Sequence, residues 1–390
     1  MYQGNIGDWP KHVEFGRGSV KRLGAVMETI GATRAVVICG NTVATGPMLE
    51  LVKAGLGDRF AGVWAGVKAH TPLDDVFVAA KEVRNMNADV VISVGGGSAM
   101  DAAKGVVIAL ATNGDFDPYT IKYLDKGMER ASLEAVTIKH IAVPTTAGSA
   151  SDVMPTAGIR DTRANRKLLF WDKALTPDAT VLDPEMAVFA NAKLTAATGM
   201  TAVARAIESL YSKDRNPYAT GIALHSARLM LRNLPLVVEN PNDLDARQNC
   251  QFACIMAGTA AINSMVSIVH AIGHVIGGRY GLQHGISHGI MLAPALRKML
   301  PMAGGDAHKY VLEALGCEHT DSVEEAANRA ADAITALMAK LPSPRRLSEV
   351  GVTQEHIAEI ASNTMGDYMM GNLPGPLSEE DVAALLREAL

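Results

Sequence analysis

The stretch DVVISVGGGSAMDAAKGVVIALAT, residues 89–112, decides the fold of the first half of this 390-residue chain. Its opening is a β-branched run typical of a buried strand, and from residue 98 it has the spacing of a helix. The glycines of Gly95–Ser98 stand where strand gives way to helix. They would let the backbone approach a phosphate, while the helix N-terminus supplies free N–H groups. A tight turn without any ligand would explain the glycines equally well.

The same alternation continues on both sides of this unit. Further strands are predicted at 32–40, 59–67, 139–146 and 179–183, and further helices at 45–56 and 72–87. Strands that alternate with helices indicate a mostly parallel sheet with helices on both faces. Neither a G-x-G-x-x-G after the first strand nor a G-x-x-x-x-G-K-[ST] is present, so the standard Rossmann fingerprint and the P-loop are both absent.

The second half of the chain has helical spacing throughout. The pattern begins near residue 186 and ends with an amphipathic helix at 379–389, where Ser378 is the expected N-cap. We therefore expect an α/β domain at 1–187 and an all-helical domain at 188–390.

Charge and composition exclude several classes of partner. The formal net charge is −5, and no block of five or more basic residues occurs, so nucleic acid and anionic membranes are not expected partners. Residues 1–16 lack the apolar core of a signal peptide, and the longest apolar run, around Gly105–Ala111, is too short to span a membrane. The four cysteines do not form a disulfide framework. These features favour a cytoplasmic protein that acts on a small molecule.

Four of the eleven histidines gather in MVSIVHAIGHVIGGRYGLQHGISHG, residues 265–289. His270 and His274 are four apart in a helical run, so they share one face. Gly277 and Gly278 are expected to end that helix, after which His284 and His288 repeat the spacing. Four imidazoles together suggest a metal site, an acid–base relay or both. For any one of them taken singly, a hydrogen bond to a carbonyl inside a helical core is the more ordinary role.

Two further patches suit ligand binding. PTTAGSAS, residues 144–151, follows a predicted strand directly and is rich in small hydroxyl side chains that can bind phosphate or ribose. Lys167 lies in the otherwise apolar run RKLLFW. It can contact a cofactor, or it can be an ordinary solvated lysine.

These segments together resemble the iron-type (group III) alcohol dehydrogenase superfamily. The resemblance is carried by VEFGRGSVKRLG (13–24), GGGSAMDAAKG (95–105), PTTAGSASDV (144–153), TPDATVLDPEM (176–186), TAATGMTAVARAIESLYS (195–212) and VHAIGHVIGGRYGLQHG (269–285). It implies an N-terminal dinucleotide-binding α/β domain, a C-terminal all-helical domain and an active site in the cleft between them. It also implies NAD or NADP as the cofactor.

The resemblance assigns cofactor contacts residue by residue. The pyrophosphate region falls to Gly96, Gly97, Ser98 and Asp101, the ribose and nicotinamide to Thr145, Thr146 and Lys167, and the adenine side to Leu182. Many members carry an acidic residue after the first strand, which binds the ribose hydroxyls and repels a 2′-phosphate. Here the stretch is Cys39-Gly40-Asn41-Thr42, without a carboxylate, so Asn41 takes that place and NADP is expected to be tolerated.

The chain departs from the family at the metal site. Metal-dependent members coordinate Fe²⁺ or Zn²⁺ with one Asp and three His. His270 and His284 match the second ligand pair, and His274 matches a non-ligand histidine between them, but Thr201 and Arg205 replace the first pair. Guanidinium has no lone pair to give and carries a permanent positive charge. We therefore expect no catalytic metal, with at most weak binding through His270 and His284, unless a neighbour such as Asp152 or His288 rescues the site.

Arg205 can stand in for the missing cation by polarising a carbonyl or binding a carboxylate, or it can be a structural arginine paired with Glu208. His270, His274 or His284 would then act as the general acid. This predicts an NAD(P)(H)-dependent alcohol dehydrogenase or carbonyl reductase. One alternative is metal-free reduction of an activated C=C, as in the maleylacetate reductases, which LQHGISHG resembles. Another is an inactive nucleotide-binding protein. The sequence leaves the substrate and a homodimer, common in the family, undetermined.

Overall fold

The computed structural model describes residues 11–124, 127–164 and 166–390. The chain divides into two compact units. The α/β unit contains the described residues up to Thr146 together with Ala150–Phe189, and the helical unit contains Ala147–Ser149 and Ala190–Leu390. The predicted boundary after residue 187 lies two residues before the chain enters the long helical part. Residues 1–10, on which the argument about a signal peptide partly rested, lie outside the described residues.

The α/β unit is built on a six-stranded sheet whose neighbouring strands all run parallel. In spatial order the strands are β1 (Val13–Phe15), β10 (Ala179–Leu182), β7 (Lys139–Pro144), β4 (Val90–Gly95), β2 (Ala35–Cys39) and β3 (Phe60–Trp64). The predicted strands are therefore confirmed. The central ones are almost continuous apolar runs because a parallel sheet is buried on both faces.

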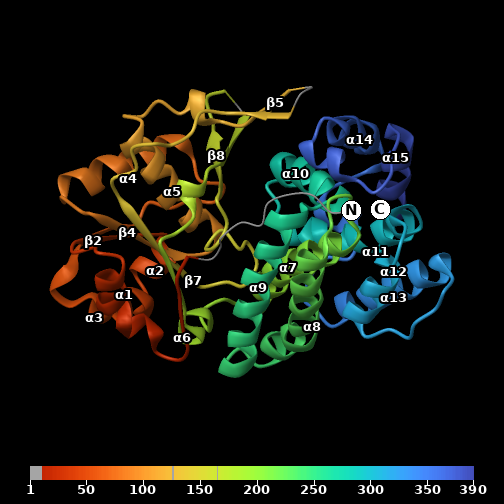
Figure 1. Ribbon diagram of the computed structural model, residues 1–390, viewed down its shortest axis with the longest axis horizontal. Coiled ribbons are helices and arrows are strands. Elements are labelled where there is room, and N and C mark those ends of the chain that lie inside the picture. The colour runs from red at the N-terminus through yellow and green to blue at the C-terminus, as the bar shows by residue number, and fades with distance from the viewer. Residues whose placement is uncertain (1–10, 125–126, 165) are drawn as a thin grey trace. The chain divides into compact units, whose positions relative to one another are not determined.

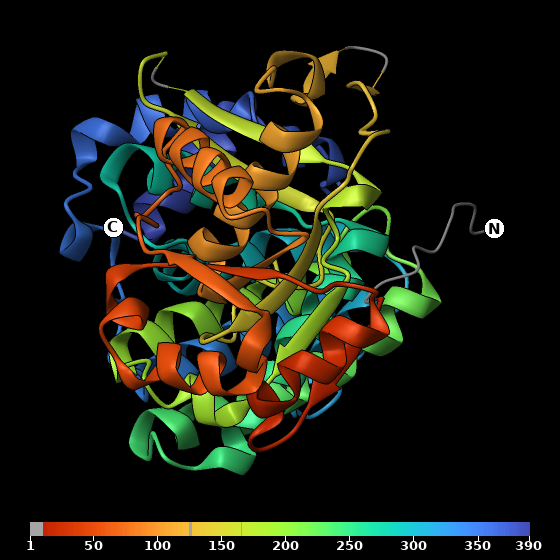
Figure 2. The same cartoon turned by 90° about the vertical axis from the view of Figure 1, so that its left-hand side faces the viewer.

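Helices cover both faces of this sheet (Figures 1 and 2). Successive side chains of a strand point to opposite faces, so Val36 and Ile38 of β2 pack under α4 and α5, whereas Val37 packs under α1 and α3. The helices of this unit are α1 (Leu23–Thr29), α2 (Asn41–Ala44), α3 (Pro47–Leu56), α4 (Leu73–Asn85), α5 (Gly97–Ala111) and α6 (Pro184–Ala187).

Two antiparallel strand pairs lie outside the main sheet, and the sequence did not predict them. They are β5 (Lys122–Leu124) with β6 (Gly127–Glu129), and β8 (Thr156–Asp161) with β9 (Arg166–Trp171). The second pair extends the core beside α5, because Ile159 and Phe170 are fully buried there. Neither β8 (TAGIRD) nor β9 (RKLLFW) is a continuous apolar run like the predicted strands of the main sheet, because each contains charged residues.

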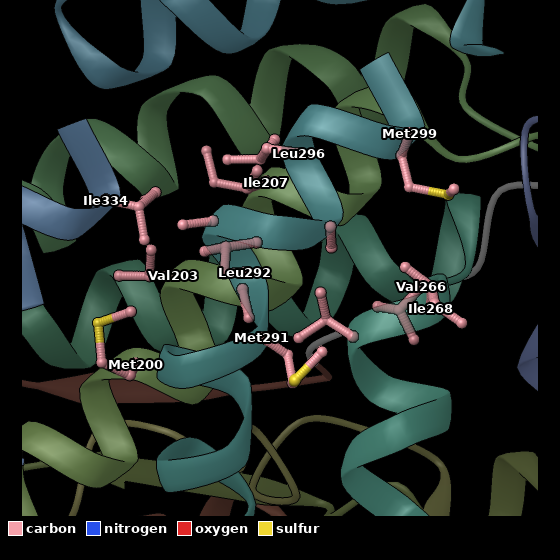
Figure 3. Close-up of a cluster of buried hydrophobic side chains, with 14 of the residues drawn as sticks. Met200, Val203, Ile207, Val266, Ile268, Met291, Leu292, Leu296, Met299 and Ile334 are labelled. Atoms are coloured by element: carbon pink, nitrogen blue, oxygen red, sulfur yellow. The ribbon is translucent and has the colours of Figure 1, made fainter. Parts of the chain in front are cut away.

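The helical unit has a single large apolar core. Its helices are α7 (Ala192–Tyr211), α8 (Pro217–Glu239), α9 (Leu244–Ser264), α10 (Ile268–Tyr280), α11 (His284–Ala303), α12 (Ala307–Leu315), α13 (Val323–Ala339), α14 (Ile357–Met365) and α15 (Glu379–Glu388). Figure 3 shows Leu292 and Leu296 of α11 among Val203 and Ile207 of α7 and Ile334 of α13. The predicted cap is confirmed, because Ser378 accepts the N–H of Asp381 at the start of α15.

Two features of this unit correct the sequence analysis. Gly277 and Gly278 do not end α10, which continues to Tyr280 and stops at Gly281 in a left-handed conformation with φ of 64°. Tertiary packing outweighs the helix-breaking tendency of a glycine pair, which costs only about 1 kcal/mol per residue. The short helix α12 was not predicted.

None of the four cysteines forms a disulfide. Cys39, Cys250 and Cys254 are buried, Cys317 is partly exposed, and all four are free thiols. Among the described residues no single helix is long and apolar enough to cross a membrane, although α9 and α10, bent by 109°, would meet that test together by length and composition alone.

Candidate active site

The turn between β4 and α5 requires glycine. Gly95 has φ of 148°, and a Cβ there would lie 2.9 Å from the Cβ of Ala99. Gly96 precedes the first residue of α5, and the first helical turn contains no acidic residue. The partial positive charge of this 15-residue helix is therefore not offset by a carboxylate within the first turn. The turn has the chemistry that a pyrophosphate needs.

The structure brings most of the predicted cofactor contacts to one edge of the sheet. Cys39 pairs with Val94, and Gly95 pairs with Pro144, so the strands end side by side. The N–H of Thr145 also donates to the carbonyl of Gly95, at 2.9 Å. This carboxyl edge carries Asn41, Gly96, Gly97, Ser98, Thr145, Thr146 and Leu182. The chain order reverses between β2 and β4, which is where open parallel sheets bind ligands.

Asp101 lies one turn into α5 and is occupied by protein partners. Its Oδ1 accepts the hydroxyl of Ser151 at 2.8 Å, and its Oδ2 accepts the N–H of Gly158 at 3.3 Å. Burial raises the pKa of this carboxyl. A carboxylate would also repel a pyrophosphate. Asp101 therefore holds Ser151, the last residue of the segment PTTAGSAS, by a hydrogen bond. Lys167 lies on β9 rather than on the sheet edge, close enough to Asp101 to interact with it electrostatically.

Lys104 is a residue of this region that the sequence analysis did not single out. Its ammonium is fully buried and donates to the carbonyls of Ser151 (2.6 Å), Met154 (2.7 Å) and Thr156 (2.7 Å). Burial lowers its pKa to about 8, so it stays charged at neutral pH. Lys104 therefore fixes the segment that follows the threonine-rich loop. Lys104 could have been predicted to matter here because it is the last residue of the motif GGGSAMDAAK.

The four histidines of residues 265–289 do come together in the helical unit. Ring centroids are 4.2 Å apart for His270 and His288, 5.7 Å for His274 and His284, and 5.8 Å for His284 and His288. Glycines of α10 make room for two of these rings. A Cβ on Gly273 would lie 2.5 Å from Nε2 of His288, and one on Gly277 would lie 3.2 Å from Nδ1 of His284. We call these four side chains the histidine cluster.

Glu208 holds His270 in place, a pairing that the sequence analysis missed. Its Oε2 is hydrogen-bonded to Nδ1 of His270, and its Oε1 accepts the N–H of Val269 at 2.7 Å. Burial raises the pKa of Glu208 to about 8, whereas burial, together with His288 and Arg205, lowers the pKa of His270 well below its ordinary value. At neutral pH the pair is therefore uncharged: protonated Glu208 donates from Oε2 to Nδ1 of His270, and the single N–H of the imidazole is on Nε2, directed away from Glu208.

Arg205 brings a positive charge to the histidine cluster. It lies on α7, is 8% exposed, and donates from Nη1 to the carbonyl of Gly148 at 3.0 Å. Its charge attracts Glu208 and contributes to the low pKa values of His270 and His288. Thr201, one turn earlier, lies against Gly285, the neighbour of His284 in the chain. The structure thus gathers Arg205, His270, His274 and His284 in one unit.

The protonation of Glu208 gives a testable pH dependence. The folded protein holds this proton up to about pH 8, whereas an unfolded chain releases it near its ordinary pKa of about 4.5. The stabilisation is complete below pH 4.5 and is lost as the pH rises through 8. His270 and His288 have lowered pKa values, so their contribution to the free energy of unfolding rises with pH, and it changes only below about pH 6.5. The contribution of Lys104 to the free energy of unfolding changes with pH only from about pH 8 upward.

The free energy of unfolding is therefore expected to fall between pH 6.5 and 8 in the native chain, and to fall less in Glu208→Gln. Urea midpoints measured at three pH values in this window check the prediction. Equal slopes for the two proteins would contradict it.

Comparison with known proteins places this chain in a family. A model described as iron-containing alcohol dehydrogenase matches residues 10–184, and one described as the C-terminal part of the Fe-containing alcohol dehydrogenase family matches residues 195–390. The chain belongs to the iron-containing alcohol dehydrogenase family. The resemblance inferred from the sequence is confirmed, and family membership makes the chain an oxidoreductase.

Individual relatives align with almost the whole chain. The NAD-dependent methanol dehydrogenase of Bacillus methanolicus is 31% identical over 378 residues, covering 96% of this chain and 97% of that protein. Maleylacetate reductase 2 of Cupriavidus pinatubonensis is 32% identical over 382 residues, covering 98% and 95%. The crystal structure of a 1,3-propanediol oxidoreductase is 27% identical, covers 98% of each chain and superposes with a TM-score of 0.89. The predicted fold class is thereby confirmed.

The donor set of the histidine cluster does not fit the iron that the family name implies. Within the ranges that the structure describes, no three His, Cys, Asp or Glu side chains are arranged to hold a metal ion. By the family pattern given in the sequence analysis, Thr201 and Arg205 stand at the positions of the first ligand pair, and a buried guanidinium opposes a cation at close range. Catalytic sites usually offer three protein ligands.

Proposed function

We propose that this chain interconverts an alcohol and an aldehyde or ketone by hydride transfer with NAD or NADP, without a catalytic metal. The observation that carries the proposal is Arg205, a buried cation at the histidine cluster where the family pattern has a metal-ligating histidine. Family membership supports the reaction class, and the NAD-dependent methanol dehydrogenase supports the cofactor.

The carboxyl edge of the sheet would hold the cofactor. Gly96, Gly97 and Ser98 would bind the pyrophosphate, and Thr145 and Thr146 the ribose and nicotinamide. The bound dinucleotide supplies or accepts the hydride. At the start of α2, Asn41 is exposed and the stretch from Cys39 to Thr42 has no carboxylate, so a 2′-phosphate would meet no repulsion there. Both cofactors are therefore expected to bind.

Arg205 would stabilise the negative charge that develops on the substrate oxygen. When the carbonyl carbon accepts a hydride, its oxygen becomes an alkoxide, and a fixed cation lowers the energy of that charge at no cost of reorganisation. A histidine of the cluster then donates the proton that completes the alcohol. Because His270 and His288 are neutral at pH 7, an alkoxide can accept an N–H from either of them.

A second reaction is favoured by one observation. Arg205 can equally bind a substrate carboxylate, and the relative from Cupriavidus pinatubonensis is a maleylacetate reductase. In that case the chain would reduce an activated C=C in a carboxylated substrate, again without a metal.

An NAD(P)H-oxidation screen separates these possibilities. Aldehydes, ketones and maleylacetate are offered to the purified protein, with and without EDTA and with added Fe²⁺ or Zn²⁺. Turnover of a carbonyl substrate at an unchanged rate under all three conditions is expected. A rate lost with EDTA and restored by metal would refute the metal-free proposal. Turnover of maleylacetate alone would select the second reaction, and no turnover with cofactor still bound would indicate an inactive nucleotide-binding protein.

A further inference from the structure

We propose that Asp367 is a positioning residue that fixes the ring of His274 for proton transfer to the substrate oxygen. The inference rests on the proposed function, because it assigns the proton donor of that reaction. No local sequence signal links the two residues, which are 93 positions apart.

The carboxylate of Asp367 is held at both oxygens. Its Oδ2 accepts a hydrogen bond from Nδ1 of His274 at 2.9 Å. Its Oδ1 accepts the N–H of Met369 at 2.8 Å and so caps the short 3-10 helix η7 (Tyr368–Asn372). A carboxylate can only accept, so Nδ1 of His274 carries the proton in this bond. The tautomer is thereby fixed, and Nε2 is the nitrogen left to exchange a proton with a substrate, as in a catalytic triad.

The residue after Asp367 restrains the same ring from another direction. The ring of Tyr368 stacks on His274 with centroids 5.8 Å apart and planes 22° apart. Asp367 therefore fixes one edge of the imidazole while Tyr368 covers a face. Two adjacent residues thus remove both the tilt and the rotation of the ring.

The far end of η7 is anchored as well. Nδ2 of Asn372 donates to the carbonyls of Ser264 (3.1 Å) and Val266 (2.9 Å), which flank the turn between α9 and α10. The N–H of Asp214 donates to Oδ1 of the same side chain at 3.2 Å. The segment Asp367–Asn372 therefore connects the turn before α10 to His274 within that helix. Its position is set by hydrogen bonds to backbone groups of the helical unit.

His274 is the member of the cluster best placed to exchange protons. Its side chain is 25% exposed, whereas that of His270 is 7% exposed and bonded to Glu208. His288 is 1% exposed. A general acid has to be reprotonated in every turnover, which needs a path to solvent. The partly exposed ring whose tautomer Asp367 fixes is therefore the donor, and the two buried rings are left as neutral walls of the site.

Asp367→Asn tests the proposal without removing the cap, because an asparagine oxygen can accept the N–H of Met369 as the aspartate does. We expect kcat to fall about 100-fold, with KM and cofactor affinity changed less than about 2-fold. Asp367→Glu, which keeps a carboxylate, should recover part of the loss. Asp243→Asn is the matched control, since Asp243 caps α9 through the N–H of Ala246 at 2.9 Å and lies on a different helix from the cluster.

A double-mutant cycle and a spectrum decide between positioning and a merely structural role. If Asp367 acts through His274, then Asp367→Asn added to His274→Ala should lower kcat no further. Fully additive losses would overturn the proposal. Proton–nitrogen spectra of the histidine rings should show Nδ1 of His274 protonated in the wild type, and a spectrum with Nδ1 bare would overturn it even if no substrate were turned over. Turnover that survives Asp367→Asn unchanged would sink this inference and leave the proposed function standing.

Discussion

Arg205→Met is expected to lower kcat/KM for the carbonyl substrate by about 100- to 1,000-fold, the range seen when one oxyanion-stabilising group is removed. Methionine fills a similar volume but brings no charge to the side of His270 and His288. The proposed cofactor contacts lie in the other compact unit, so the NAD dissociation constant should stay within about 2-fold of its wild-type value. Steady-state kinetics and a cofactor titration check the two expectations together.

Arg247→Met is the matched control for this variant. Arg247 is also a buried arginine of the helical unit, 4% exposed, but it bonds to the carbonyls of Pro241 and Ala190 and to the hydroxyl of Thr195. We expect it to lower stability and to leave kcat/KM of the folded enzyme close to wild type. An equal loss of activity in both variants would mean that Arg205 is structural.

The converse experiment rebuilds the family's ligand pattern. Thr201→Asp with Arg205→His supplies the missing pair, so a divalent metal should bind far more tightly than in the wild type. If Arg205 serves the native substrate, the native metal-independent activity should disappear in this double variant. Unchanged native activity would refute the role of Arg205.

Gly285→Ala is expected to destabilise the helical unit by at least about 3 kcal/mol. A Cβ at this position would lie 1.5 Å from the carbonyl oxygen of Ala197 and 2.8 Å from Oγ1 of Thr201. The first obstacle is helix backbone, which no rotamer change can move, so α7 and α11 would have to separate. Chemical denaturation should show a lower midpoint.

Gly278→Ala provides the control with the opposite sign. Gly278 is exposed on α10, and a Cβ there would meet nothing within 4 Å. Replacing a helical glycine without a clash should raise stability by about 0.5–1 kcal/mol. If the two alanine variants had similar stabilities, the close contact between α7 and α11 would be disproved.

The sequence predicted those parts of the fold whose hydrophobic period can be seen within one continuous segment. The strand, turn and helix of residues 89–112 lie next to one another in the chain, and each has enough residues to show its period. The β8–β9 pair was missed because both strands mix charged with apolar residues and because their cover by α5 comes from tertiary packing. The glycine pair at 277–278 misled the prediction because a local helix-breaking tendency was outweighed by packing around α10.

In the candidate site, too, residues close together in the sequence could be predicted, whereas partners far apart in the sequence could not. His270, His274, His284 and His288 could be grouped in advance because they lie within 19 residues at helical spacing. Their partners could not. Glu208 lies on α7, and Asp367 lies 93 residues beyond His274, so only the folded chain brings each carboxylate to its imidazole. Arg205 could be singled out from the sequence because it replaces a ligand of the family pattern. The structure adds that its charge is buried beside His270.

The fit of His288 against Gly273 has a consequence for anyone who redesigns this cluster. A side chain at position 273 and an imidazole at position 288 exclude each other, because the Cβ of the first would overlap the ring of the second. The residue tolerated at position 273 therefore depends on the residue at position 288, and the reverse. A library that varies either residue alone will sample mostly clashes or voids, whereas one that enlarges position 273 as it shrinks position 288 can reshape the wall of the site while keeping the helices at their present spacing.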